Sequence, residues 1–286
     1  MKREDLDLKY LATQKSIDGK KGWETLRVFT DKEYEHLSSS QEILQFHQFN
    51  KRTKDMVIRN GKELEDYIRY YRNTKNNEDD ETKVLWEANR LLLNFLASFS
   101  SYIDQSKKNM SKYYGEEKKD SWKKILSSFY DDPEHYEYRF MCKLRNFISH
   151  YGFPFDYFLK NNQGSFIFMS KSNLLTFKKW AGVKNDLQQL ENEYIHIVPV
   201  LQKHRANINL IYRLMMMEYA EKLIKAIETV NKLCKETQSE FAFIEVESVE
   251  DLNDPSKMII ESFSLEPLHE ALNDLKNHPK IEMKIK

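Results

Sequence analysis

The segment from about Glu81 to Tyr114, ETKVLWEANRLLLNFLASFSSYIDQSKKNMSKYY, decides the fold of this chain. Its apolar residues recur every three or four positions and so share one broad face of an α-helix. They are Val84, Leu85, Ala88, Leu91, Leu92, Phe95, Leu96, Phe99, Tyr102 and Ile103. Such a long apolar face needs other helices to cover it, because exposed apolar surface is unfavourable in water. The segment therefore predicts a mainly α-helical bundle.

Other segments repeat this helical spacing. We expect helices over about 31–72, 121–130, 133–151 and 183–235. Only seven glycines and six prolines occur among the 286 residues, which also favours helix. Gly61 is expected to interrupt the first of these helices, and Pro199 to break or kink the last. The polar run from Asn73 to Asp80 predicts a linker or an exposed loop.

Short extended segments complete the predicted fold. Residues 153–159 and 165–169 flank a turn-forming Asn-Asn-Gln-Gly run and predict a β-hairpin. Further strands are predicted over 241–247, 257–263 and 281–285, and a helix over 267–277. We therefore expect three regions: a helical region over 1–80, a helical bundle over 81–238 with the hairpin at about 153–170, and a small α+β appendage over 239–286.

The overall composition limits the classes of function. Lysine plus arginine equals aspartate plus glutamate at 45 each, so any nucleic-acid binding must come from a local patch. The first residues lack the apolar core of a signal peptide, and the most apolar run, residues 91–97, is too short to span a bilayer. Cys142 and Cys234 show no metal-ligand pattern, and the chain has no glycine-rich nucleotide loop. We expect a cytoplasmic protein with no membrane partner, metal or cofactor.

The richest chemistry lies in Arg145-Asn146-Phe147-Ile148-Ser149-His150, near the end of the helix predicted over 133–151. Gly152 and Pro154 should stop that helix just after the motif. An arginine can neutralise charge on phosphoryl oxygens, and a histidine can move a proton near neutral pH. The grouping therefore suits chemistry on a phosphodiester. The alternative is that Arg145 is an ion-pairing surface residue and that His150 is favoured by the helix dipole.

The Arg-Asn-x-x-x-His pattern resembles the motif of the HEPN family, α-helical proteins that include many metal-independent endoribonucleases. The resemblance covers about 82–235. It implies a HEPN-like helical bundle in which Arg145 and His150 are catalytic and Asn146 supports them. It also implies a toxin or anti-phage defence protein that cuts cellular RNA. In some members an acidic or polar residue of the first long helix faces the motif, for which Asp104 and Glu87 are candidates.

Cleavage by the 2′-hydroxyl of RNA needs one group to take a proton and another to give one to the leaving oxygen. A single motif supplies one histidine, whereas two facing copies supply two. Arg145 and His150 also lie about 140° apart around a helix axis. We therefore expect a homodimer with a site shared by two protomers, as the resemblance also implies.

Residues near the motif could guide the RNA. Lys143 and Tyr151 adjoin it and are the predicted RNA contacts. A lysine-rich patch with aromatic rings is a second candidate, although a solvated helix face has the same composition. Its members are Lys107, Lys108, Lys112, Tyr113, Tyr114, Lys118, Lys119, Trp122, Lys123 and Lys124.

Two other functions remain open. One is a non-catalytic HEPN-like RNA-binding or protein-interaction module, paired with an antitoxin, a regulatory protein or a nucleotidyltransferase. The other is a helical adaptor unrelated to that family, in which the motif is coincidental.

Overall fold

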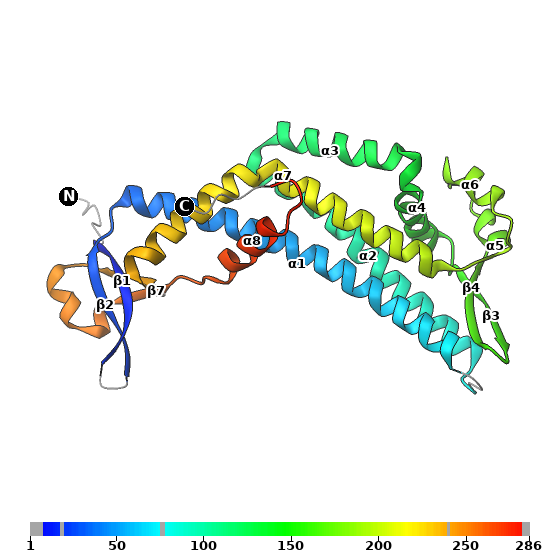
Figure 1. The fold of residues 1–286 in the computed structure, drawn as a ribbon, viewed down its shortest axis with the longest axis horizontal. Helices are drawn as coiled ribbons and strands as arrows, with labels where there is room; N and C mark the ends of the chain where they lie inside the picture. The colour runs from blue at the N-terminus through cyan, green and yellow to red at the C-terminus, as the bar shows by residue number, and fades with distance from the viewer. Residues whose placement is uncertain (1–7, 18–19, 75–77, 239–240, 282–286) are drawn as a thin grey trace. The chain divides into compact units, whose positions relative to one another are not determined.

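The computed structural model describes residues 8–17, 20–74, 78–238 and 241–281. The protein is mainly helical with two small antiparallel sheets, which confirms the predicted mainly α class (Figure 1). The chain divides into two compact units, Asn50–Met215 and Met1–Phe49 with Met216–Lys286. Helices α1 (Asp31–Asn73) and α7 (Ile197–Thr237) each contribute to both units.

The Asn50–Met215 unit is built around α2 (Glu81–Tyr114), which has the bounds predicted from its apolar face. The Asp80 side chain caps it by accepting a hydrogen bond from the Lys83 N–H at 3.1 Å. Figure 1 shows α2 running beside α1 and α7. Gly61 lets α1 approach closely, because a Cβ there would lie 2.9 Å from the ring of Phe95. The expectation that Gly61 interrupts the helix was wrong, since α1 continues through it.

The remaining elements of this unit follow α2. They are α3 (Glu116–Asp131), a 3-10 turn (Pro133–His135), α4 (Tyr136–His150), β3 (Phe155–Asn161), β4 (Gly164–Ser170), α5 (Lys171–Thr176), α6 (Val183–Gln189) and β5 (Tyr194–Ile195). The predicted hairpin is confirmed as β3–β4, and β5 adds a third strand to it. Gly164 begins β4 with φ of 144°, and a Cβ there would collide with the Arg72 carbonyl oxygen.

One long helix over 183–235 was also expected, with its break at Pro199. The structure has α6 and α7 instead, separated by a segment that contains β5. Pro199 lies in the first turn of α7, where its missing N–H leaves no helical hydrogen bond unmade. The prediction placed the interruption a few residues too late along the chain.

The other unit contains a four-stranded antiparallel sheet. Its order is β2 (Lys20–Val28), β1 (Leu8–Ile17), β6 (Phe241–Val246) and β7 (Ile259–Ser262). Two 3-10 turns (Val249–Asn253 and Pro255–Lys257) and α8 (Glu266–Lys276) complete it. The buried His47 ring of α1 links α7 and α8, with Nδ1 3.0 Å from the Tyr219 hydroxyl and Nε2 3.2 Å from the Asp274 carboxylate.

This arrangement corrects the three expected regions. β1 pairs with β6, so the two ends of the chain form one sheet rather than an N-terminal helical region and a separate appendage. The predicted 257–263 strand and 267–277 helix are confirmed as β7 and α8. Residues 282–285 of the strand expected over 281–285 lie outside the described residues, and Ile281 is not in a strand.

Candidate functional site

Helix α4 carries the predicted motif, and its start follows the expected capping. The Asp132 carboxylate accepts a hydrogen bond from the Glu134 N–H at 2.9 Å, and Pro133 opens the 3-10 turn that leads into α4. One face of α4 is buried, where Phe140 and Phe147 stack on the Trp180 ring with centroids 5.9 and 6.0 Å away. Because this face is fixed against the core, the opposite face is presented outward.

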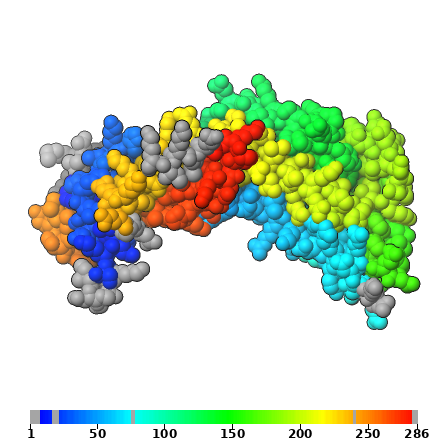
Figure 2. All heavy atoms as spheres, in the orientation of Figure 1, coloured from blue at the N-terminus to red at the C-terminus, as the bar shows by residue number. Residues whose placement is uncertain are grey.

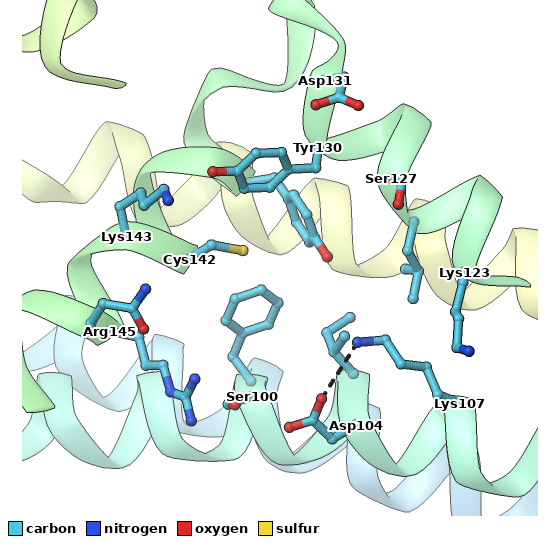
Figure 3. Close-up of a pocket in the computed structure, with 15 residues that line it drawn as sticks. Ser100, Asp104, Lys107, Lys123, Ser127, Tyr130, Asp131, Cys142, Lys143 and Arg145 are labelled. Atoms are coloured by element: carbon cyan, nitrogen blue, oxygen red, sulfur yellow. Dashed lines mark hydrogen bonds and ion pairs between the residues drawn. The ribbon is translucent and has the colours of Figure 1, made fainter. Parts of the chain in front are cut away.

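The outward face of α4 borders a cavity of about 560 Å³ whose other walls come from α2 and α3. Figure 3 shows this cavity, and Figure 2 shows α3 in green on the surface of the Asn50–Met215 unit. Four cationic side chains and two carboxylates line it: Lys107, Lys123, Lys143, Arg145, Asp104 and Asp131. Cations outnumber carboxylates, so the cavity favours an anionic ligand although the whole chain is neutral.

Arg145 and Asn146 both line the cavity. In Figure 3 the Arg145 guanidinium extends from α4 toward α2, beside Ser100. Within the part of the chain that the structure describes, Arg145 forms no ion pair and no side-chain hydrogen bond. This finding argues against the alternative in which Arg145 is an ion-pairing surface residue.

The lysines of the cavity differ in how strongly they are engaged. Lys107 Nζ lies 3.5 Å from an Asp104 carboxylate oxygen, which is a weak pair, and Lys123 Nζ lies 2.9 Å from Asp120. Both pairs are solvent-exposed and therefore exchange readily for other anions. Lys143 has no carboxylate partner among the described residues, and its Nζ lies 6.0 Å from the centre of the Tyr130 ring.

The other two predicted residues lie outside the cavity. His150 is the last residue of α4 and is exposed to solvent. It lies one turn beyond Asn146 on the same side of the helix, about 6 Å further along the axis. The Tyr151 side chain is 55% exposed, and its ring packs against Phe147 and Phe177. The structure thus brings Arg145, Asn146 and Lys143 together and leaves His150 and Tyr151 at the open end of α4.

The cavity also contains a thiol that cannot serve as a nucleophile near neutral pH. Burial raises the pKa of Cys142 to about 12, although the nearby Lys143 and Lys107 cations act in the opposite direction. The thiol therefore stays protonated at pH 7.

Sequence reasoning missed the α3 contribution to the cavity. Tyr130, Ser127 and Asp131 line it, but no motif in the sequence links them to Arg145. Trp122 of the lysine-rich patch is not available to a ligand, because its ring is buried and its Nε1 donates to the Ser106 hydroxyl at 2.9 Å. Of the lysine-rich patch, only Lys107 and Lys123 reach the cavity.

The two acidic candidates on α2 are now distinguished. Asp104 lines the cavity across from Arg145, as Figure 3 shows. Glu87 does not line it and is bound to Arg90, with Nη2 2.5 Å from a carboxylate oxygen. Of these two candidates, Asp104 is thus the one that lines the same cavity as Arg145.

Searches for a metal site and a membrane-spanning helix among the described residues, and for related proteins, each gave a negative result. Over 8–17, 20–74, 78–238 and 241–281, no three His, Cys, Asp or Glu side chains are grouped so that they could hold a metal ion. None of the helices in these ranges combines the length and hydropathy needed to cross a bilayer. Comparison with known protein families, curated proteins and solved structures found no match.

Proposed function

We propose that this chain is a metal-independent endoribonuclease with a HEPN-like helical bundle. The observation that carries the proposal is the arrangement on α4: Arg145 and Asn146 line an open, positively charged cavity, and His150 is exposed on the same helix. A guanidinium without a carboxylate partner is free to bind phosphoryl oxygens, and an exposed imidazole is free to transfer a proton.

The reaction assigns a role to each residue. The 2′-hydroxyl of RNA attacks the adjacent phosphorus, the bond to the 5′ oxygen breaks, and a 2′,3′-cyclic phosphate forms. One histidine takes the 2′ proton and another donates a proton to the leaving 5′ oxygen. Arg145 stabilises the charge that builds on the phosphoryl oxygens, and Asn146 orients them. Lys143 and Tyr151 contact the strand.

A shared site between two protomers supplies the second histidine. His150 lies outside the cavity that contains Arg145 of its own chain, so the cavity alone lacks a histidine. In a homodimer with the open ends of α4 facing each other, the His150 side chains of both copies flank one scissile phosphate that Arg145 binds. We propose such a homodimer, and a toxin or anti-phage defence role in the cytoplasm that an antitoxin or regulatory protein restrains.

The test compares wild type with His150→Ala on total RNA in the presence of EDTA. Wild type should cut the RNA and leave 2′,3′-cyclic phosphate ends, and His150→Ala should lose at least about 10²-fold in rate, as expected for loss of a general acid or base. His269→Ala, which removes an exposed histidine from α8, is the matched control and should cut normally. Equal cutting by wild type and His150→Ala, or a strict need for magnesium, would reject the mechanism.

The same geometry favours one alternative, a non-catalytic RNA-binding or protein-interaction module. It rests on the observation that His150 does not reach the cavity of its own chain. In that case neither wild type nor His150→Ala cuts RNA, and growth is inhibited equally by both or by neither.

A further inference from the structure

The cavity between α2, α3 and α4 is larger than a single phosphate requires. Its volume of about 560 Å³ lies within the range of roughly 300–1,000 Å³ that is usual for sites of small organic ligands. Arg145 occupies one side of it, whereas Lys107 and Lys123 lie at the other side on α2 and α3, and the Tyr130 ring lies near Lys143. These residues are not needed to bind the scissile phosphate.

The walls of the cavity differ in chemistry. Its floor is apolar, because the buried side chains of Phe99, Ile103, Leu126 and Tyr138 form it. Cations surround the floor, and the half-buried Tyr130 ring borders it. An apolar floor with an aromatic side wall and a cationic rim matches the three parts of a nucleotide, whose base is flat and apolar on its faces and whose phosphate is anionic.

We propose that this cavity binds one unpaired nucleotide of the RNA strand, next to the phosphate held by Arg145. The base packs against Tyr130 and the floor, and Lys107 and Lys123 contact the phosphate on its far side. The strand then leaves over Asn146 toward His150. The inference rests on the proposed function for the identity of the strand as RNA, and it adds that this nucleotide must be unstacked.

A base inside a duplex cannot enter such a cavity. Paired bases are stacked on both faces, and the deep, narrow major groove of A-form RNA keeps side chains away from them. The protein should therefore bind single-stranded RNA more tightly than duplex RNA of the same length, and it should cut at unpaired positions.

Binding is best tested without cleavage, using full-length wild-type protein and a labelled single-stranded oligonucleotide whose 2′-hydroxyls are methylated. The double variant Lys107→Ala/Lys123→Ala should weaken binding at least about tenfold, because two phosphate-contacting cations are lost. Its control is Lys108→Ala/Lys124→Ala, which removes the same charges from adjacent, exposed positions of α2 and α3 that do not line the cavity. The control should bind within about twofold of wild type, and equal weakening by both pairs would overturn the proposal.

The ring of Tyr130 offers an independent test. Tyr130→Phe keeps a stacking surface and should bind like wild type, whereas Tyr130→Leu should bind roughly five- to 100-fold more weakly, as for loss of one base–aromatic contact. Tyr70→Leu removes a 58% exposed ring that is outside the cavity and should have no effect. Equal binding by the Phe and Leu variants would overturn the assignment of Tyr130.

Two further binding experiments distinguish this cavity from a surface site for any RNA and from a site for a free nucleotide. Duplex RNA that binds as tightly as the single strand, or adenosine monophosphate that displaces the strand at equal concentration, would overturn the proposal in favour of a surface site or of a free nucleotide. Cleavage is measured separately on unmodified RNA. Loss of cleavage with intact, cavity-dependent binding of single-stranded RNA would reject the nuclease and leave the cavity assignment standing.

Discussion

Each unit contains a cavity lined by basic side chains, and the two differ in how their arginines are engaged. In the unit with both chain ends, a cavity of about 290 Å³ is lined by Arg27, Lys32, Glu33, His36 and Lys232 among others. The Arg27 guanidinium lies 2.6 Å from Glu236 and 3.0 Å from Glu33. In the Asn50–Met215 unit, Arg145 lines its cavity without such a partner in the described part of the chain.

The difference separates a structural arginine from one available to a ligand. Hydrogen bonds to Glu236 and Glu33 raise the pKa of Arg27, and the bond from Arg27 lowers the pKa of Glu33 to about 2. These bonds link β2, the start of α1 and the end of α7. Arg145 makes no such link, so an anion can bind it without first displacing a carboxylate.

The largest expected effect concerns cleavage by the two arginine variants. Arg145→Ala should lower the rate of RNA cleavage by roughly 10²- to 10³-fold, the usual loss when one group that stabilises transition-state charge is removed. Arg27→Ala should cut RNA like wild type. Single-turnover rates on one RNA substrate measure both. A normal rate for Arg145→Ala would remove the distinction between the two cavities.

Mixing two inactive proteins tests whether the Arg145 cavity is completed by a partner. Arg145→Ala and His150→Ala combined after unfolding and refolding together should regain part of the activity, because a mixed dimer keeps one Arg145 and one His150 on opposite chains, whereas each parent dimer lacks one of these residues altogether. Arg27→Ala mixed with His150→Ala should add only the activity of the Arg27→Ala protein. Failure of the first mixture to regain activity, while a dimer is present in solution, would argue against a shared site.

Acid should weaken the unit that contains the Arg145 cavity through a buried histidine behind the cavity floor. His204 packs against Phe99 and Tyr138, with ring centroids 4.6 and 6.0 Å away, and burial lowers its pKa from 6.5 to about 3. As the pH falls below about 6.5, His204 therefore binds a proton in the unfolded chain but stays neutral in the folded chain. The contribution of neutral His204 to the free energy of unfolding is fully present above pH 6.5 and is lost progressively as the pH falls toward 3.

Protonation of His204 in the unfolded chain should therefore lower the free energy of unfolding by about 2 kcal/mol between roughly pH 7 and pH 5. His204→Leu should lose correspondingly less free energy of unfolding over that interval, as measured by urea titration at both pH values. The Arg27–Glu33 pair should contribute almost equally at both, because the ordinary Glu33 pKa of 4.5 and its folded value of about 2 both lie below pH 5. An identical pH dependence for wild type and His204→Leu would show that the folded protein accommodates the proton.

The smallest expected effect is the change in the free energy of unfolding when Arg27 is replaced. Arg27→Ala should lower the free energy of unfolding at pH 7 by about 1 kcal/mol, because partly exposed ion pairs contribute little each. Lys232→Ala removes an exposed cation from the same cavity and should change stability less. Urea titration distinguishes the two variants, and equal values would show that the Arg27 bonds add nothing to folding.

The sequence predicted the elements better than their assembly. Periodicity located α2, the β3–β4 hairpin and α8, because spacing along a helix or strand is a local property. It failed at Gly61 and Pro199, where the effect of a residue depends on contacts or on its exact turn. For the candidate site, the motif predicted Arg145 and Asn146 and the lysine-rich patch included Lys107 and Lys123, but nothing local indicated that these lysines would share a cavity with the motif, or that Tyr130 would join them.

The sequence by itself determined that the chain is mainly helical and that an arginine, an amide and a histidine lie close together near the end of one helix. These properties follow from composition and from the 3.6-residue period. Only the tertiary structure decided that β1 pairs with β6, that Arg27 meets two carboxylates, and that Arg145 lines a cavity without one. The reason is physical: contacts between residues far apart in the chain are set by how buried faces pack, and that packing determines which charges remain available to a ligand.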